Sequence, residues 1–254
     1  MSNFDKLRHF ENFDTIYQCL KISSSKILEI YKDLDPTITY KEDNSPLTQA
    51  DLAANQHITS SLNAIGDLPI ISEENNVRET QHPKYWLVDP LDGTKEFIKK
   101  NGEFTINIAL IENQYPSQGY VYSPISGFLY VGGAGLGSFK IKNNEINTIK
   151  VRKAVEPIKI VASRSHLNED TQKFIQQYQN HELMQAGSSI KLCMIAEGLA
   201  DIYPRLAPTS EWDTAAAQAV VEGAGGSVKD LQGNRLRYQK DNILNPHFIV
   251  RGNI

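Results

Sequence analysis

The spacing of apolar residues predicts two helices in the first quarter of the chain. Residues 10–33 carry apolar side chains at Phe13, Ile16, Tyr17, Leu20, Ile27, Ile30 and Tyr31. These intervals are typical of an amphipathic helix. The stretch 34–47 is rich in turn formers, and we expect a loop there. Thr48 and Asp51 then have the spacing of a capping box, which predicts a second helix running to about Ile65.

The pattern then changes to one of strands. Two short apolar segments, Pro69–Ser72 and Tyr85–Val88, are typical of buried strands. From Phe104 to Lys142 four strand-like runs alternate with turn residues, which predicts an antiparallel sheet: FTINIALI, GYVYSP, GFLYVGG and GSFKIK. The run GGAGLG at 132–137 lies among these strands and lacks the last glycine of a dinucleotide-binding fingerprint, so we interpret it as a turn.

A looser polar stretch, 143–157, predicts a boundary between two domains, 1–150 and 151–254. The second is expected to contain a strand at Ile158–Ala162, helices near 168–178, 189–198 and 213–223, and short terminal strands. The fold class predicted from this order of elements is α/β, with an α+β first half that holds the central antiparallel sheet.

Composition narrows the classes of function. The chain has 254 residues, 40% hydrophobic and 22% charged, with a net charge of −4 and a pI of about 5.9. Without a basic surplus, a nucleic-acid partner is not expected. The two cysteines lie far apart and have no metal-ligand spacing, and the N-terminus is polar. No apolar run is long enough to span a bilayer. These features favour a cytoplasmic protein. Peripheral contact with the inner membrane stays open.

The segment Asp89-Pro90-Leu91-Asp92-Gly93-Thr94 carries the strongest chemical signal. We expect a buried strand to end in Asp89, Pro90 to fix a turn, and Gly93-Thr94 to open a helix. Two carboxylates and the Leu91 carbonyl are oxygen ligands of the kind that Mg²⁺ prefers. Amides at the start of a helix suit a phosphate. The alternative is an ordinary turn, because Asp-Gly is a common turn pair.

Three further acids strengthen the metal hypothesis. Glu73 follows a predicted strand, Asp213 begins an Ala-rich helix, and Asp51 could orient a water as a general base. Each has a structural alternative: a solvated acid, a helix cap, and the capping box, respectively. For Asp51 we expect the two roles to compete. Several carboxylates in one pocket raise one another's pKa, and Mg²⁺ would remove that conflict.

Four blocks resemble the inositol monophosphatase superfamily: Asp43-x-Ser45-Pro46-x-Thr48-x-x-Asp51, Ser72-Glu73-Glu74, the segment 89–94, and Trp212-Asp213-Thr214-Ala215-Ala216. Further segments are most similar to its bacterial 3′(2′),5′-bisphosphate nucleotidases: 41–46, Lys95-Glu96-Phe97, Ser163-Arg164-Ser165-His166 and the run 187–216. The resemblance implies a layered α-β-α-β-α sandwich of the inositol monophosphatase and sugar phosphatase type.

The resemblance also implies roles for individual residues. The implied ligands of two to three Mg²⁺ ions are Glu73, Asp89, the Leu91 carbonyl, Asp92 and Asp213. Asp51 and the Thr94 hydroxyl would activate the attacking water. The substrate would contact Gly93, Thr94 and metal-site residues Glu73, Leu91, Asp92 and Asp213, while the nucleoside and second phosphate would be held by His166, Ser188, Lys191 and Arg205.

Each of the last four residues has an alternative. Lys191 on a helix is usually a solvated charge, His166 a surface or capping residue, and Ser188 a helix cap. Arg205 is harder to dismiss, because its side chain suits a bidentate phosphate contact.

The implied reaction is hydrolysis of adenosine 3′,5′-bisphosphate to AMP and phosphate, linked to sulfate assimilation. The implied partner is thus a small-molecule nucleotide, with 3′-phosphoadenylyl sulfate as a second substrate. One alternative is an inositol or sugar monophosphatase, against which the Ser188–Arg205 region argues. Another is an inactive nucleotide sensor, against which the intact Asp51, Thr94 and metal carboxylates argue. A monomer and a homodimer both stay open.

Overall fold

Two β-sheets and the helices around them make up the described part of the chain, which in this computed structural model is residues 6–32, 38–40, 46–75, 82–164 and 167–254. Within it lie six helices: α1 (Phe13–Tyr31), α2 (Gln49–Asn63), α3 (Thr94–Ile98), α4 (Glu169–Gln176), α5 (Ile190–Ala196) and α6 (Ala215–Gly223). All six helices expected from the sequence are present, including α3, which Gly93-Thr94 was expected to open.

The larger sheet contains the antiparallel strands predicted from Phe104 onward. In spatial order its described strands are β3 (Ile70–Ser72), β4 (Lys84–Asp92), β5 (Thr105–Glu112), β6 (Tyr115–Ser123), β7 (Phe128–Gly133), β8 (Gly137–Lys142) and β9 (Glu145–Ile149). Only β3 and β4 run parallel. β9 lies where we expected a loose boundary. Asn143 and Asn144 both have positive φ angles, 50° and 65°, as a two-residue hairpin turn requires.

The smaller sheet is formed by β10 (Ile158–Ser163), β11 (His181–Ala186), β12 (Ile202–Arg205), β13 (Ser227–Asp230) and β14 (Phe248–Arg251). Its order is β11-β10-β12-β14-β13. β11 was not predicted, because its sequence HELMQA lacks the apolar alternation of a half-buried strand. It lies at the sheet edge and pairs in parallel with β10.

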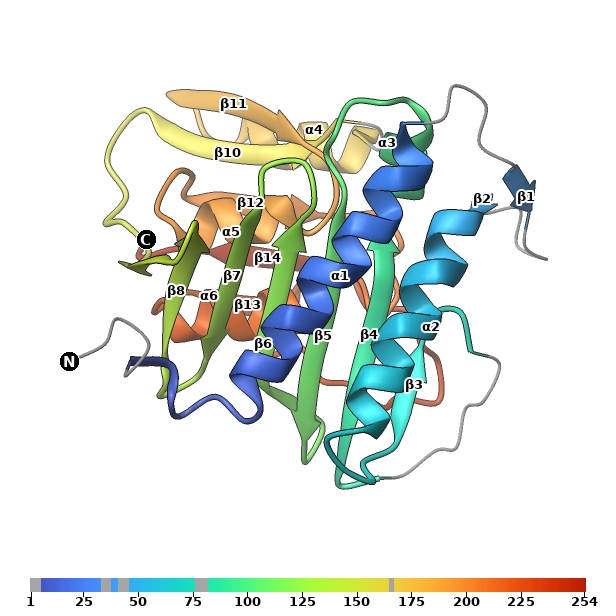
Figure 1. The fold of residues 1–254 in the computed structure, drawn as a ribbon. Coiled ribbons are helices and arrows are strands. Elements are labelled where there is room, and N and C mark those ends of the chain that lie inside the picture. Colours follow the sequence, from blue (N-terminus) through green and yellow to red (C-terminus); the bar gives the residue numbers. More distant parts are fainter. Residues whose placement is uncertain (1–5, 33–37, 41–45, 76–81, 165–166) are drawn as a thin grey trace.

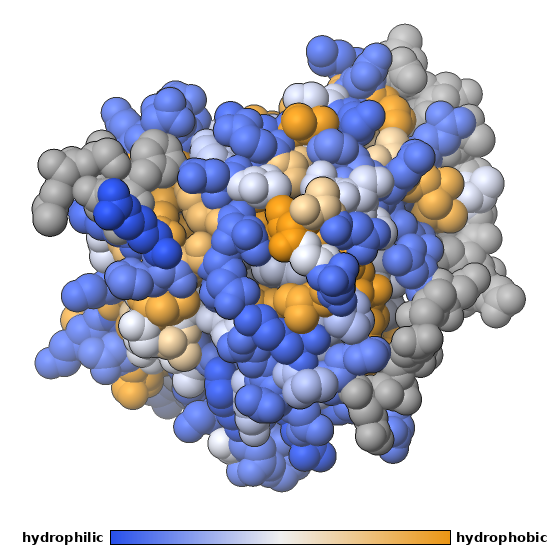
Figure 2. All heavy atoms as spheres, turned by 60° about the horizontal axis from the view of Figure 1, so that its bottom comes forward, coloured by the Kyte–Doolittle hydropathy of each residue, from blue (hydrophilic) through white to orange (hydrophobic). Residues whose placement is uncertain are grey.

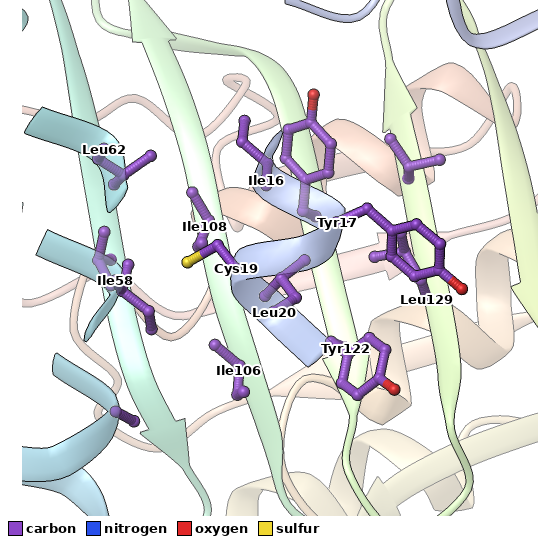
Figure 3. Packing of buried hydrophobic residues seen from close by; sticks show 14 of the residues in the cluster. Ile16, Tyr17, Cys19, Leu20, Ile58, Leu62, Ile106, Ile108, Tyr122 and Leu129 are labelled. Carbon is purple, nitrogen blue, oxygen red and sulfur yellow. The ribbon is translucent and has the colours of Figure 1, made fainter. Parts of the chain in front are cut away.

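The sheets and helices alternate in five layers (Figure 1). α1 and α2 pack on one face of the larger sheet through a core that includes Cys19, Leu20 and Ile58 (Figure 3). α5 and α6 lie between the two sheets in a second core, and α4 covers the smaller sheet through Ile175. α6 approaches β6 closely, since a Cβ at Gly119 would lie 2.0 Å from the Ala216 carbonyl oxygen. The α-β-α-β-α sandwich is confirmed.

Part of the expected loop 34–47 is instead a pair of short antiparallel strands, β1 (Ile38–Tyr40) and β2 (Pro46–Thr48). The resemblance residues at 41–45, and His166, lie outside the described residues.

Hydrophilic residues cover most of the face shown in Figure 2, and hydrophobic residues form smaller areas between them. None of the helices in the described ranges is long and apolar enough to cross a membrane. Both cysteines are free and buried.

Candidate functional site

The acidic motif lies at the end of β4, but the strand does not stop at Asp89 as predicted. It continues to Asp92, and its pairing with β5 shifts register between these two residues. Such an irregularity re-aims side chains along a strand. Asp89 and Asp92 are joined by Asp213, which comes just before α6, and one oxygen from each can lie within 4.8 Å of the others. The structure therefore brings together acids 124 positions apart in the chain (213 − 89).

Glu73 comes next to this cluster through parallel pairing of β3 with β4. Its backbone N–H donates to the Val88 carbonyl at 3.1 Å, which places it beside Asp89. Its charge contributes to the raised pKa of both Asp89 and Asp213. The Leu91 carbonyl accepts a hydrogen bond from the Thr94 hydroxyl at 3.3 Å.

The electrostatics of the cluster favour a bound cation. Burial raises the pKa of Asp89 well above its ordinary value, and repulsion from Glu73, Asp92 and Asp213 raises it further. Burial, followed by repulsion from Asp92 and Glu73, raises the pKa of Asp213 to about 8. Buried like charges are costly without compensation, and a set of carboxylate oxygens is the donor set of a hard divalent cation. These residues fit Mg²⁺.

Asp51 keeps its capping box and contacts Thr94 at the same time, so its carboxylate does not have to leave the cap to reach that residue. Its Oδ2 accepts from the Thr48 amide at 2.9 Å and the Thr48 hydroxyl at 2.5 Å, which forms the predicted capping box. Its Oδ1 accepts from the Thr94 hydroxyl at 3.2 Å. A carboxylate has two oxygens, so one serves the cap while the other faces Thr94. Burial raises the pKa of Asp51, and the Thr48 hydrogen bonds oppose that shift.

Gly93 turns the chain from β4 into α3. Its φ of 92° lies in the left-handed region, and a Cβ there would meet the Glu103 carbonyl oxygen at 3.1 Å. Gly93 and Thr94 line a pocket together with Glu73, Asp92 and Asp213. Three of the predicted acids thus meet Gly93 and Thr94 at one cavity, whereas Asp51 and Asp89 do not line it.

The same pocket is also lined by two cations, Lys191 and Arg205. Lys191 is 4% exposed, so the solvated-charge alternative is wrong. Burial lowers its pKa to about 8, against the opposing attraction of Asp92. Its ammonium donates to the Ser188 carbonyl and lies 5.5 Å from the centre of the Tyr203 ring. The resulting group is cationic, poorly hydrated and close to the acidic cluster.

Arg205, at the end of β12, donates from Nη2 to the Pro208 carbonyl at 2.8 Å. Its buried Nε finds no hydrogen-bond partner within the described ranges. A buried donor left unsatisfied is costly, and an anion in the pocket would satisfy it.

Ser188 also lines the pocket, and its hydroxyl accepts from the Ile190 amide at 3.5 Å, so a capping role for this residue stays open. The N-cap of α5 is Ser189, and Ser188 precedes it with a φ of 45°. A non-glycine residue in the left-handed region is uncommon and is often found at ligand sites.

Prediction from sequence missed three buried polar residues beside Asp92. Thr105 and Asn107 lie on β5 opposite Asp92 and Asp89 in the strand pairing, and Ser189 donates its amide to Asp92 at 2.6 Å. A signal was present in the sequence. Thr105 and Asn107 alternate with Ile106 and Ile108, so one face of an otherwise apolar strand is polar near its start.

Comparisons with known proteins agree with this fold and motif set. Residues 10–251 match the model of the inositol monophosphatase family. Proteins named 3′(2′),5′-bisphosphate nucleotidase CysQ, from Shigella flexneri and Escherichia coli K12, are each 43% identical to this chain over 245 residues, 93% of this chain and 98% of theirs.

Among solved structures, CysQ from Bacteroides thetaiotaomicron has a TM-score of 0.85 and 38% identity, covering 96% of this chain and 99% of its own. An inositol monophosphatase from Zymomonas mobilis, 24% identical with a TM-score of 0.78, covers 97% of this chain and 95% of its own and shares the fold. The chain therefore belongs to the inositol monophosphatase family.

Proposed function

We propose that this protein is a Mg²⁺-dependent 3′(2′),5′-bisphosphate nucleotidase, which hydrolyses adenosine 3′,5′-bisphosphate to AMP and phosphate. The observation that carries the proposal is a single pocket lined both by carboxylates and by two cations, Lys191 and Arg205. A substrate with two phosphates matches such a pocket. The names of relatives 43% identical to this chain support the same activity.

In this proposal two to three Mg²⁺ ions are held by Glu73, the Leu91 carbonyl and the three clustered aspartates, Asp89, Asp92 and Asp213. When bound, Mg²⁺ offsets the charge of the carboxylates and the phosphate and makes a nearby water more acidic. Asp51 and Thr94 would orient the attacking water, and its proton would pass to the Asp51 carboxylate, whose Oδ1 already accepts from the Thr94 hydroxyl. The amides of Gly93 and Thr94 face the transferred phosphoryl group.

Lys191 and Arg205 bind the second phosphate, with Ser188 beside them, and His166 contacts the nucleoside. A partly dehydrated ammonium and an unsatisfied guanidinium N–H both gain more from a phosphate than solvated cations do. An inositol monophosphate carries one phosphate and would leave this part of the pocket unused. This contrast favours the nucleotide over the inositol or sugar ester.

The test compares phosphate release from adenosine 3′,5′-bisphosphate and from inositol 1-phosphate, each with Mg²⁺ and with EDTA. We expect Mg²⁺-dependent release, faster from the nucleotide. Faster release from the inositol ester would support the monophosphatase alternative, and no release from either would support a nucleotide sensor. Asp92→Asn serves as the control, because it should abolish release while the circular dichroism spectrum stays that of the wild type.

A further inference from the structure

Three buried polar residues without a role in the reaction described above converge on Asp92. Asn107 donates from Nδ2 to Asp92 Oδ2 at 3.4 Å, and Ser189 donates its amide to the same oxygen at 2.6 Å. The Thr105 hydroxyl is 3.5 Å from that oxygen and 2.8 Å from the Ser189 hydroxyl. Each of these three residues is at most 2% exposed, so water does not substitute for the contacts.

The orientation of the Asn107 amide follows from its neighbours. A carboxylate only accepts hydrogen bonds, so the amide NH₂ must face Asp92. Its carbonyl oxygen then accepts from the Ser189 hydroxyl at 2.9 Å, and the Thr105 hydroxyl is 3.2 Å away. The amide therefore joins β5, the end of β4 and the residue that caps α5 in a single arrangement.

Asn107 and Ser189 donate to the same oxygen of Asp92, and the Thr105 hydroxyl supports them through its 2.8 Å contact with the Ser189 hydroxyl. The other oxygen of Asp92 keeps its lone pairs for a cation, while the hydrogen bonds to Oδ2 hold the carboxylate in place. The same contacts fix the position of Ser189, which lies two residues before Lys191 in the chain. The buried side-chain amide of Asn107 thus contacts both Asp92 in the acidic cluster and Ser189 near Lys191.

We infer that Asn107 is a positioning residue that orients Asp92 for cation binding and, through Ser189, sets the position of Lys191. The substrate part of this inference rests on the function proposed above, whereas the cation part does not. Asn107 touches neither substrate nor water in this scheme, and it acts through Asp92 and Ser189.

The opposing explanation is that Asn107 is only a buried amide whose loss destabilises the fold. Gln118 provides a matched control. It is a 6% exposed amide on β6 that accepts from the Glu11 amide at 2.9 Å and the Tyr120 hydroxyl at 3.2 Å, away from the acidic cluster. Gln118→Leu should lower stability without changing the affinity for Mg²⁺.

The experiment measures Mg²⁺ binding by isothermal titration calorimetry without substrate, for the wild type, Asn107→Leu, Asn107→Asp and Gln118→Leu. We expect both Asn107 variants to bind Mg²⁺ about 10–100-fold more weakly, the usual effect of removing a partner of a metal ligand. Asn107→Asp keeps the shape of the side chain but sets a second acid against Asp92, so it tests the orientation argument without a cavity. At saturating Mg²⁺, both should also raise KM for adenosine 3′,5′-bisphosphate more than they lower kcat.

Wild-type Mg²⁺ affinity in a folded Asn107 variant would overturn the inference, as would an equal loss in Gln118→Leu. If Asn107→Leu does not fold, the result for Asn107→Asp decides. Weakened Mg²⁺ binding in a protein that does not hydrolyse the nucleotide would leave the role of Asn107 intact and contradict only the proposed function.

Discussion

At the scale of single residues, Asp51 joins a helix cap to the proposed catalytic site. Its two oxygens have separate partners: Thr48 in the cap of α2, and the Thr94 hydroxyl. Removing Asp51 would therefore damage the helix and the reaction at once. Thr94 is the better residue to change, because its hydroxyl contacts Asp51 Oδ1 and the Leu91 carbonyl in the proposed site and is not part of the cap of α2.

We predict that Thr94→Val lowers kcat for phosphate release by about 10²–10⁴, the range that positioned proton-transfer groups contribute. Steady-state kinetics at saturating Mg²⁺ measure this. Thr94→Ser, which keeps the hydroxyl, should retain most activity.

Thr48→Ala provides the structural comparison, since losing the cap should cost about 1 kcal/mol of stability. A large loss of kcat in Thr94→Ser, or none in Thr94→Val, would exclude this role for the hydroxyl.

At the scale of elements, α5 connects the pocket to the larger sheet. Lys191 lies in its first turn, and Glu197 caps its C-terminus. Glu197 accepts from Lys140 Nζ at 2.6 Å and from the Tyr130 hydroxyl at 2.9 Å, and both donors are on the larger sheet. The side chains of this ion pair are only 18% and 19% exposed, so it is less screened by water than a surface pair.

We predict that Glu197→Ala lowers the free energy of unfolding by about 1–3 kcal/mol, between the values for exposed and fully buried ion pairs. Urea denaturation measures the change. Glu169, paired with Lys173 on α4 at 2.7 Å, is the control, because its side chain is 79% exposed. Glu169→Ala should change stability by less than about 0.5 kcal/mol. Equal effects of the two substitutions would contradict the anchoring role of Glu197.

At the scale of the whole molecule, the pocket is lined by both sheets and by segments that lead into three helices. Asp92 comes from the larger sheet, and Arg205 and Phe248 come from the smaller one. Asp213 comes from the segment that connects β12 to α6. The site thus depends on how the layers are stacked. The division of the chain at residue 150 stays a prediction, as does cytoplasmic location.

Removal of metal should make the stability of the protein depend on pH. Asp213 has a pKa of about 8 in the folded metal-free protein against an ordinary value of 3.8. Between these values the folded protein binds a proton that the unfolded chain has lost, so the free energy of unfolding falls as pH rises from about 4 to about 8. Thermal denaturation in EDTA should show a falling Tm over this range.

Added Mg²⁺ should raise Tm most at the upper end of that range, where the carboxylates are charged. Asp213→Asn removes the titrating group, and its Tm in EDTA should depend less on pH and respond less to Mg²⁺. A wild-type Tm that rises with pH in EDTA would contradict the cause assigned to the raised pKa.

The sequence by itself determined most helices, most strands and the acidic motif, because apolar periodicity and the Thr48–Asp51 cap are local signals. It did not predict β11, which is a strand because it pairs with β10 although its composition does not favour one. It also did not predict the register shift between Asp89 and Asp92, through which β4 continues to Asp92. Only the tertiary structure decided that Lys191 is buried, that Asp51 divides its oxygens, and that Asn107 contacts Asp92. Burial, pKa and hydrogen bonding depend on groups distant in the chain, which no local pattern can place.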